Sequence, residues 1–390
     1  MTPSPGSRPP ESRWARGCGV QFRPFALERY FAKYEFAVEH LLSASDPESL
    51  TLQELLALAD TQSLALWQEL KLAYTESQGH PLLREAIAGT YSSIDPRDVL
   101  VAVPEEAIFI AMNCLLRPGD HVIATFPAYQ SLHEIAGSLG CRLTRWPLSQ
   151  NGERWELDLG LLADSLADDT RLIVINFPHN PTGFLPERAT LDAILDLARR
   201  RGVYIFSDEM YRRLEYTPER RLPAICDLYE RGVSLSGLSK TFSLPGLRLG
   251  WLATADRELL ASCAVFKDYT TICGSAPSEI LGIMALRAGE RIIARNLGII
   301  RANLHLADEF FVRQQDRFTW LRPQAGPVCL PRLLSDLSVA ALCEGLLERK
   351  SVMLLPGEVF EFGDNYFRLG LGRRDFPEGL AILEAYLDGT

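Results

Sequence analysis

Short apolar runs alternate with amphipathic stretches between residues 99 and 255 of the chain. The apolar runs are Val99–Val103, His121–Thr125, Leu172–Ile175, Val203–Phe206, Val233–Leu235 and Leu247–Ala253. The stretches between them with helical periodicity are Ala107–Leu116, Gln130–Leu139 and Pro186–Arg201. Strands without polar alternation suit a sheet that is covered on both faces. This alternation predicts an α/β domain with a mostly parallel sheet.

The pattern changes after residue 275. Ala276–Gln315 is mostly helical, with one long amphipathic stretch from Arg291. Further predicted elements are a strand at Phe318–Leu321, a helix at Ser338–Arg349, strands at Val352–Leu355 and Tyr366–Leu369, and a last helix from Phe376. We therefore expect a large α/β domain over residues 59–287 and a small α+β domain built from residues 21–58 and 288–390. Residues 1–20, rich in Pro, Ser, Gly and Arg, are predicted to be a disordered tail.

Composition excludes several classes of protein. Of the 390 residues, 47% are hydrophobic and 23% charged, which is ordinary for a globular enzyme or binding protein. The net charge of −10 disfavours non-specific electrostatic binding to nucleic acid or to an anionic membrane. The sequence has no apolar run of 18 residues, no apolar core of a signal peptide, no C-x-x-C pair among its eight cysteines and no H-E-x-x-H motif. We expect a cytoplasmic protein with reduced thiols and no metal site.

Three polar residues follow three successive predicted strands. Asn180, Asp208 and Lys240 are spaced by 28 and 32 residues. Each alone fits an ordinary structural role: a loop amide, a turn cap and a surface lysine. Together they would meet at one rim of a parallel sheet, where open α/β proteins bind ligands. An amine, an acid and an amide donor are the groups that pyridoxal 5′-phosphate needs.

The surrounding motifs resemble those of the class I/II aminotransferases, the fold-type-I pyridoxal phosphate enzymes. Asn180–Gly183 matches N-P-T-G, Asp208–Tyr211 matches D-E-x-Y, and Ser239-Lys240 with Pro245–Trp251 matches S-K…P-G-x-R-x-G-W. The motifs occur in the family's order, and the resemblance runs from about Leu41 to the C-terminus. It implies a seven-stranded type of large-domain sheet, pyridoxal 5′-phosphate as cofactor and a homodimer with shared active sites.

The resemblance also implies roles for individual residues. Lys240 would form the Schiff base with the cofactor and then shuttle the substrate proton. Asp208 would face the pyridine nitrogen, and Asn180 and Tyr211 would bond the phenolic oxygen. Arg248 and Ser239 would contact the phosphate.

At three further positions the resemblance implies a role in the active site, and an ordinary structural role is the alternative. Tyr129 would stack on the pyridine ring, or it is a core tyrosine. Tyr74 would reach the phosphate of the partner subunit, or it is a helix-surface aromatic. Arg368 would bind the substrate α-carboxylate through two N–H groups, because a planar guanidinium is suited to this, or it forms a strand-edge ion pair.

Two positions depart from the family pattern. Val103–Ala107 stands where the family has a Gly-Ala-x-x-Ala phosphate loop, and Pro104 lacks an N–H donor. The backbone N–H groups of Glu105 and Glu106 remain available for the phosphate, provided that their carboxylates point away. Gly237 replaces a serine three residues before the lysine, for which Ser236 or Ser239 would compensate.

The expected activity is transfer of an amino group from an L-amino acid to a 2-oxo acid. Rival reactions on the same cofactor are those of a C–S lyase, a decarboxylase or an amino-acid cyclase such as capreomycidine synthase. An effector domain of a transcriptional regulator and a nucleotide-binding oxidoreductase rank lower, because the chain has no N-terminal helical module and no G-x-G-x-x-G after an early strand. The side chain of the substrate stays open, since no second arginine is clearly placed for a dicarboxylic acid.

Overall fold

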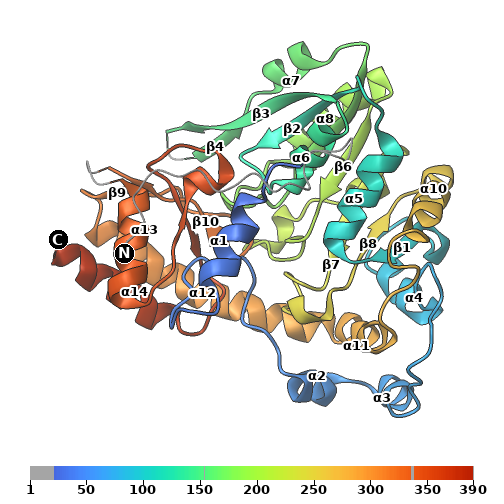
Figure 1. The fold of residues 1–390 in the computed structure, drawn as a ribbon, viewed down its shortest axis with the longest axis horizontal. Helices are drawn as coiled ribbons and strands as arrows, with labels where there is room; N and C mark the ends of the chain where they lie inside the picture. The colour runs from blue at the N-terminus through green and yellow to red at the C-terminus, as the bar shows by residue number, and fades with distance from the viewer. Residues whose placement is uncertain (1–21, 153, 335–337, 390) are drawn as a thin grey trace, which may run out of the picture.

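The computed structural model describes residues 22–152, 154–334 and 338–389 (Figure 1). The predicted tail, residues 1–20, lies outside these ranges. Within them, every helix is too short or too polar to span a bilayer.

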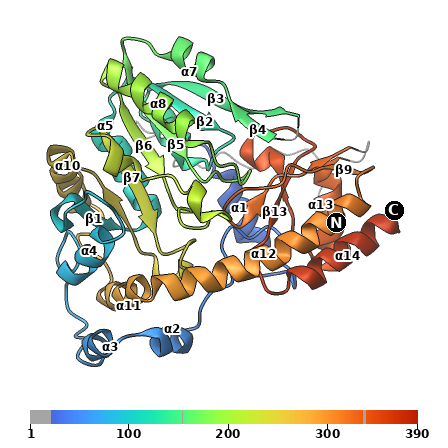
Figure 2. The ribbon, with the colours of Figure 1, turned by 180° about the vertical axis from the view of Figure 1, so that it is seen from behind.

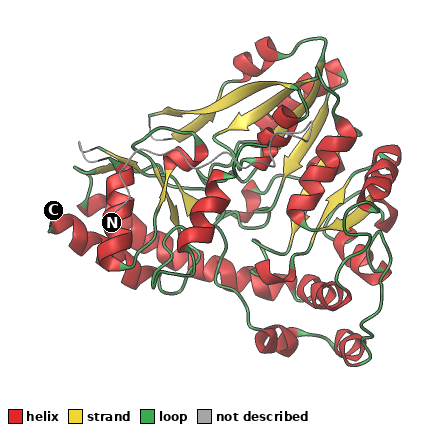
Figure 3. Cartoon of the chain, in the orientation of Figure 1, coloured by secondary structure: helices red, strands yellow, loops and turns green. Residues whose placement is uncertain are grey.

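A mostly parallel sheet forms the centre of the larger part of the molecule (Figure 3). Its strands are β1 (Val99–Ala102), β2 (His121–Phe126), β3 (Arg142–Asn151), β4 (Arg154–Leu157), β5 (Thr170–Asn176), β6 (Tyr204–Asp208), β7 (Gly232–Gly237) and β8 (Gly250–Ala253). The order is β1-β8-β7-β6-β5-β2-β3-β4, and β3, β2, β5, β6 and β7 are mutually parallel. The predicted α/β class is confirmed. Sequence reasoning missed the hairpin β3–β4, because β3 is mostly exposed and lacks a continuous apolar run.

Helices cover both faces of this sheet, as the apolar strands require. One face packs against α5 (Pro104–Leu115), α6 (Ser131–Ser138) and α10 (Arg257–Lys267). The other packs against α7 (Leu159–Ser165), α8 (Arg188–Arg201) and α9 (Ile225–Leu228). Helix α8 ends at Gly202, whose φ of 63° is left-handed and suits glycine. Helix α5 begins at Pro104, three residues before the predicted start, because proline fits the first helical position.

The C-terminal part combines long helices with small sheets (Figure 2). Its helices are α11 (Ala276–Arg287), α12 (Gly289–Arg313), α13 (Val339–Lys350) and α14 (Phe376–Asp388). Strands β10 (Val328–Cys329), β13 (Phe367–Gly370) and β12 (Leu355–Pro356) form one sheet, and β9 (Phe318–Thr319) pairs with β11 (Arg332–Leu333). The prediction of a strand over Val352–Leu355 is wrong for most of its length: Val352 makes only an isolated bridge to His40.

The N-terminal helices join the two parts. Helix α1 (Ala26–Tyr34) lies between the central sheet and the C-terminal strands in Figures 1 and 2. Helices α2 (Leu52–Leu58) and α3 (Thr61–Gln68) pack on α11, and α4 (Pro81–Ala88) packs on α11 and β1. One apolar cluster includes Leu42, Trp251 and Phe367, so it runs through both expected domains. The division into domains stays a prediction.

Candidate active site

Three neighbouring strands bring the predicted amide, carboxylate and lysine to one rim of the sheet. Asp208 is the last residue of β6 and is paired in register with Asn176, the last residue of β5. Asn180 follows β5 by four residues, and Lys240 follows the end of β7 by three. The carboxyl ends of parallel strands share one edge, which is where ligands bind in open α/β sheets.

The amine of Lys240 is held by a serine from the N-terminal segment. Nζ donates a hydrogen bond of 2.7 Å to Oγ of Ser45. Part of the lysine side chain remains accessible, but the surrounding protein displaces enough water to lower the pKa of Lys240, while the nearby carboxylate of Asp46 acts in the opposite direction. A lowered pKa increases the share of neutral amine, the form that attacks a carbonyl and accepts a proton.

The carboxyl group of Asp208 is only 7% exposed. Its Oδ1 accepts a hydrogen bond of 3.1 Å from the backbone N–H of Met210. Burial raises the pKa of Asp208 to about 6, although the Met210 N–H and the charge of Lys240 act against the rise. A cationic group bound against a buried acid of this kind would stabilise its ionised form.

Asn176, which sequence reasoning missed, joins Asp208 to the Asn180 loop. Its Nδ2 donates to the backbone oxygen of Asp208 at 2.9 Å, and its Oδ1 accepts from the N–H of Asn180 at 2.7 Å. An amide at the end of an otherwise apolar strand was the available signal.

Arg368 is 1% exposed, and two of its N–H groups have no partner in the described part of the chain. Its Nε and one terminal nitrogen donate to the Ser43 carbonyl at 3.1 and 2.8 Å, and the other terminal nitrogen donates to Oδ1 of Asn180 at 3.3 Å. These bonds use three of the five N–H groups of the guanidinium. Within the described part of the chain, one N–H on each terminal nitrogen remains, which is the arrangement for binding a carboxylate through two bonds.

Ser43 to Asp46 form a segment that contacts several site residues through its backbone. Besides the Ser43 carbonyl on Arg368, the Ser45 carbonyl accepts from the Tyr211 hydroxyl at 2.8 Å. A Cβ on Gly370 would lie 2.2 Å from the oxygen of Ala44, so only glycine permits this approach. Sequence reasoning missed Ser43 and Ser45; the glycine after Arg368-Leu369 was the only sign of a close approach.

The first turn of α5 contains the N–H groups of Glu105 and Glu106, which the resemblance assigns to the cofactor phosphate. Its N-cap residue, Val103, has no side-chain cap, so the N–H groups of the first turn are not used by that route. The carboxylate of Glu105 accepts from Oγ of Ser131 at 3.2 Å, and that of Glu106 accepts from the hydroxyls of Thr270 and Thr271. Burial raises the pKa of Glu105 to about 7, partly offset by the Ser131 bond.

The two departures from the family pattern contact each other. Pro104 lies over the antiparallel pair formed by Gly237 and Gly250. A Cβ on Gly237 would stand 3.2 Å from Cγ of Pro104, and a Cβ on Gly250 would stand 2.7 Å from it. Glycine at 237 therefore accommodates the proline ring, while the neighbouring Ser239 keeps its hydroxyl buried, without a partner among the described residues.

The remaining predicted residues lie in different surroundings. Tyr129 donates through its hydroxyl to Oε1 of Glu28 at 2.9 Å, and its ring lies 5.0 Å from that of Phe25. Arg248 is exposed, donates to the Pro245 carbonyl at 3.0 Å, and lines a pocket of about 130 Å³ that Glu106 also lines. Tyr74 is 90% exposed on the single chain.

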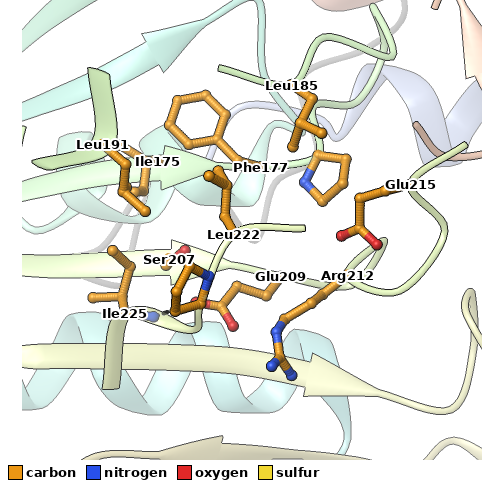
Figure 4. Close-up of a pocket in the computed structure, with 12 residues that line it drawn as sticks. Ile175, Phe177, Leu185, Leu191, Ser207, Glu209, Arg212, Glu215, Leu222 and Ile225 are labelled. Atoms are coloured by element: carbon orange, nitrogen blue, oxygen red, sulfur yellow. Dashed lines mark hydrogen bonds between the residues drawn. The ribbon is translucent and has the colours of Figure 1, made fainter. Parts of the chain in front are cut away.

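Glu209, next to Asp208 in the D-E-x-Y motif, faces the opposite side of the sheet. Ser207 and Glu209 line a cavity of about 10 Å³. Leu191 of α8 and Ile225 of α9 line the same cavity (Figure 4). Glu209 accepts from Oγ of Ser234 at 2.8 Å and from the N–H of Ile225 at 2.9 Å. Since side chains alternate along a strand, Asp208 and Glu209 serve different faces, and the small cavity belongs to the packing behind the sheet.

The set of donors and acceptors fits pyridoxal 5′-phosphate. The amine of Lys240 suits its aldehyde, and the buried acid of Asp208 suits a protonated pyridine nitrogen. The unpartnered hydroxyl of Ser239 and the N-terminal turn of α5 suit its phosphate. Three or more potential metal ligands do not cluster anywhere in the described ranges.

Known proteins resemble this chain over most of its length. The family model "Aminotransferase class I and II" matches residues 39–375. A capreomycidine synthase from Streptomyces vinaceus is 31% identical over 80% of both chains, and an arginine–pyruvate transaminase from Pseudomonas aeruginosa is 30% identical over 75% of this chain and 76% of its own. The crystal structure of a PLP-dependent aminotransferase from Streptococcus suis superposes with a TM-score of 0.89 at 30% identity, covering 95% of this chain and 99% of that one.

Proposed function

This chain belongs to the class I and II aminotransferase family, and we propose that it moves the amino group of an L-amino acid to a 2-oxo acid by way of Lys240. It is an enzyme dependent on pyridoxal 5′-phosphate. The observation that carries the proposal is the meeting of a lysine amine, a buried acid and an arginine fork at one end of the sheet.

The bound cofactor supplies an electron sink for the bond that breaks at the substrate Cα. Lys240, with its lowered pKa, would accept the proton from Cα and deliver it to C4′ of the cofactor, and in the second half of the reaction it would move a proton in the opposite direction. The buried carboxyl of Asp208 would bind the pyridine nitrogen of the cofactor and would keep that nitrogen protonated. Arg368 binds the α-carboxylate through its two remaining N–H groups and so orients Cα toward Lys240.

A second candidate function is cyclisation of an amino acid on the same scaffold. The relative that favours it is the capreomycidine synthase, at 31% identity over 80% of this chain. Cyclisation and transamination begin with the same loss of the Cα proton, so Lys240 would serve both reactions.

We also propose that two copies of the chain form a homodimer in the cytoplasm. Tyr74, Leu72 and Tyr269 are between 87% and 90% exposed, which is unusual for large apolar side chains and suits a covered surface. The seven described cysteines are unpaired, which suits a reducing compartment. Light scattering of the purified protein tests the dimer, and recovery of activity on mixing Lys240→Ala with Tyr74→Ala tests whether the subunits share their sites.

The reaction is tested by incubating the cofactor-loaded enzyme with a panel of L-amino acids and pyruvate. Formation of L-alanine together with a new 2-oxo acid supports transamination. In parallel incubations without added pyruvate, release of ammonia together with a 2-oxo acid from a single amino acid would indicate elimination instead. Release of carbon dioxide would indicate decarboxylation, and a cyclised product without L-alanine would indicate cyclisation. Lys240→Ala is expected to abolish turnover, and full activity in that variant would overturn the role of the lysine.

A further inference from the structure

Helix α1 lies over the active site and presents one face to it. Phe25, Glu28 and Phe31 are spaced by three residues, so they share a side of the helix. The Phe25 ring lies 5.0 Å from that of Tyr129, and the guanidinium of Arg368 lies 5.6 Å from the centre of the Phe31 ring. Glu28 stands between these two contacts and accepts the Tyr129 hydroxyl at 2.9 Å.

Contacts before the helix, at its first residue and at its middle hold this face in place. Before it, Arg23 pairs with Glu134 of α6 at 2.7 Å, and the N–H of Ala26 donates to Oε1 of Gln130 at 2.9 Å. Halfway along the helix, the Tyr30 hydroxyl donates to the carbonyl of Leu354 at 3.2 Å. These contacts connect α1 to the large sheet and to the C-terminal part.

Glu28 is a carboxylate that no cation pairs with in the part of the chain described. The neighbouring carboxylate Glu105 receives the Ser131 hydroxyl, and Asp46 pairs with Arg373 at 3.1 Å. Burial lowers the pKa of both Arg368 and Lys240, and the charge of Glu28 is close enough to oppose this at both.

We take Arg368 and Lys240 as the residues nearest to the two ends of a bound amino acid. Its carboxylate takes the fork of Arg368, and its amino group lies toward Lys240. Glu28, which pairs with no cation in the described part of the chain, then stands between Phe25 and Phe31 on the side of α1 that lies toward Tyr129 and Arg368. A carboxylate side chain is repelled there, whereas a cation gains a charge-assisted bond to Glu28 and contacts with aromatic faces.

We propose that the substrate of this enzyme is an amino acid with a positively charged side chain, and that Glu28 selects it. This inference rests on the proposed function, since it takes Arg368 and Lys240 as the groups that bind the two ends of an amino acid. It holds equally for transamination and for cyclisation.

The test uses pairs of amino acids of similar length, one with a cationic side chain and the other with a neutral side chain. The cofactor-loaded enzyme is given L-arginine and its neutral analogue L-citrulline, then L-lysine and its neutral analogue L-norleucine, and amino-acid consumption is followed whatever the product. We expect kcat/KM to be about 10- to 100-fold higher for the cation of the preferred pair, the range of one charge-assisted hydrogen bond. The two pairs tell a guanidinium from an ammonium substrate.

Glu28→Gln keeps the size of the side chain and an oxygen for Tyr129, but it removes the charge. In this variant, kcat/KM for the cation is expected to exceed that for the neutral analogue by about threefold or less. The kcat/KM for the neutral analogue itself should not fall. Glu39→Gln is the matched control, because Glu39 is exposed and lines a surface pocket formed with α13 and α14. Glu39→Gln should retain the wild-type ratio of kcat/KM between cation and neutral analogue.

Titration calorimetry with the cofactor-loaded Lys240→Ala variant, in which turnover is expected to be abolished, measures the binding of each pair independently of turnover. Equal binding of cation and neutral analogue by this variant together with their equal consumption by the wild-type enzyme would overturn the inference, as would an undiminished ratio in Glu28→Gln. Selective binding of the cation without formation of a new 2-oxo acid would leave the inference standing and remove the proposed transamination.

Discussion

Asp208 offers a prediction in which stability and function move in opposite directions. Its pKa of about 6 in the folded chain compares with 3.8 for an unperturbed aspartate. The folded protein therefore binds a proton more tightly than the unfolded chain, and stability of the apoprotein falls as the pH rises through the interval between these values. Above pH 6 the full penalty of keeping a buried carboxylate is present.

The size of the penalty follows from the shift. About two pKa units correspond to about 3 kcal/mol at pH 8 and, since the titration is then incomplete, to about 1.5 kcal/mol at pH 5. Asp208→Asn removes the charge and keeps an oxygen for the Met210 N–H. The variant apoprotein should be more stable than the wild type by up to these amounts, which raises the unfolding temperature at pH 8 by about 2–4 °C for a chain of this length.

The assay is thermal unfolding of both apoproteins at pH 5 and pH 8, with Asp164→Asn as a control that removes an exposed carboxylate from α7. The same Asp208→Asn variant, loaded with cofactor, should lose at least about a thousandfold in kcat, because its amide does not hold the pyridine proton. An Asp208→Asn apoprotein that is no more stable than the wild type at pH 8, or whose advantage does not grow between pH 5 and pH 8, would refute the reasoning.

Two further substitutions test separate parts of the account. Arg368→Lys replaces a fork with a single ammonium, so steady-state kinetics should show kcat/KM for the amino acid lowered by about 10- to 100-fold, mainly through KM; an unchanged KM would contradict carboxylate binding by Arg368. Gly237→Ala places a Cβ 3.0 Å from the Leu249 oxygen and 3.2 Å from Pro104, so we expect a loss of about 1–3 kcal/mol in denaturant unfolding. The control Gly298→Ala, in an exposed and open position of α12, should instead gain about 0.5–1 kcal/mol, and equal stability of the two variants would contradict the packing argument.

The rim of the sheet was predictable because its residues follow strands that the sequence reveals. Asn180, Asp208 and Lys240 each come shortly after an apolar run, and parallel pairing brings them together without further information. The mostly parallel sheet follows from the same pattern. Arg368 was found through the resemblance alone, because a strand arginine carries no distinctive local signal.

The rest depends on contacts that no local pattern encodes. The carbonyls of Ser43 and Ser45 act through the backbone, which any residue possesses, and they meet Arg368 and Tyr211 from far along the chain. Glu28 gains its place only when α1 docks beside Tyr129. The packing of Pro104 on Gly237 requires α5 to cross the β7–β8 pair, so the sequence showed two departures from a pattern but not that they compensate each other.

The central claim is that Lys240 carries the cofactor. The chain has five lysines, Lys33, Lys71, Lys240, Lys267 and Lys350, so the bond can be located without ambiguity. Borohydride reduction of the holoenzyme followed by peptide mass spectrometry fixes the cofactor to whichever amine holds it. The account predicts the pyridoxyl label on Lys240 alone, and a label on Lys267 or any other lysine, or no stoichiometric label, would contradict it.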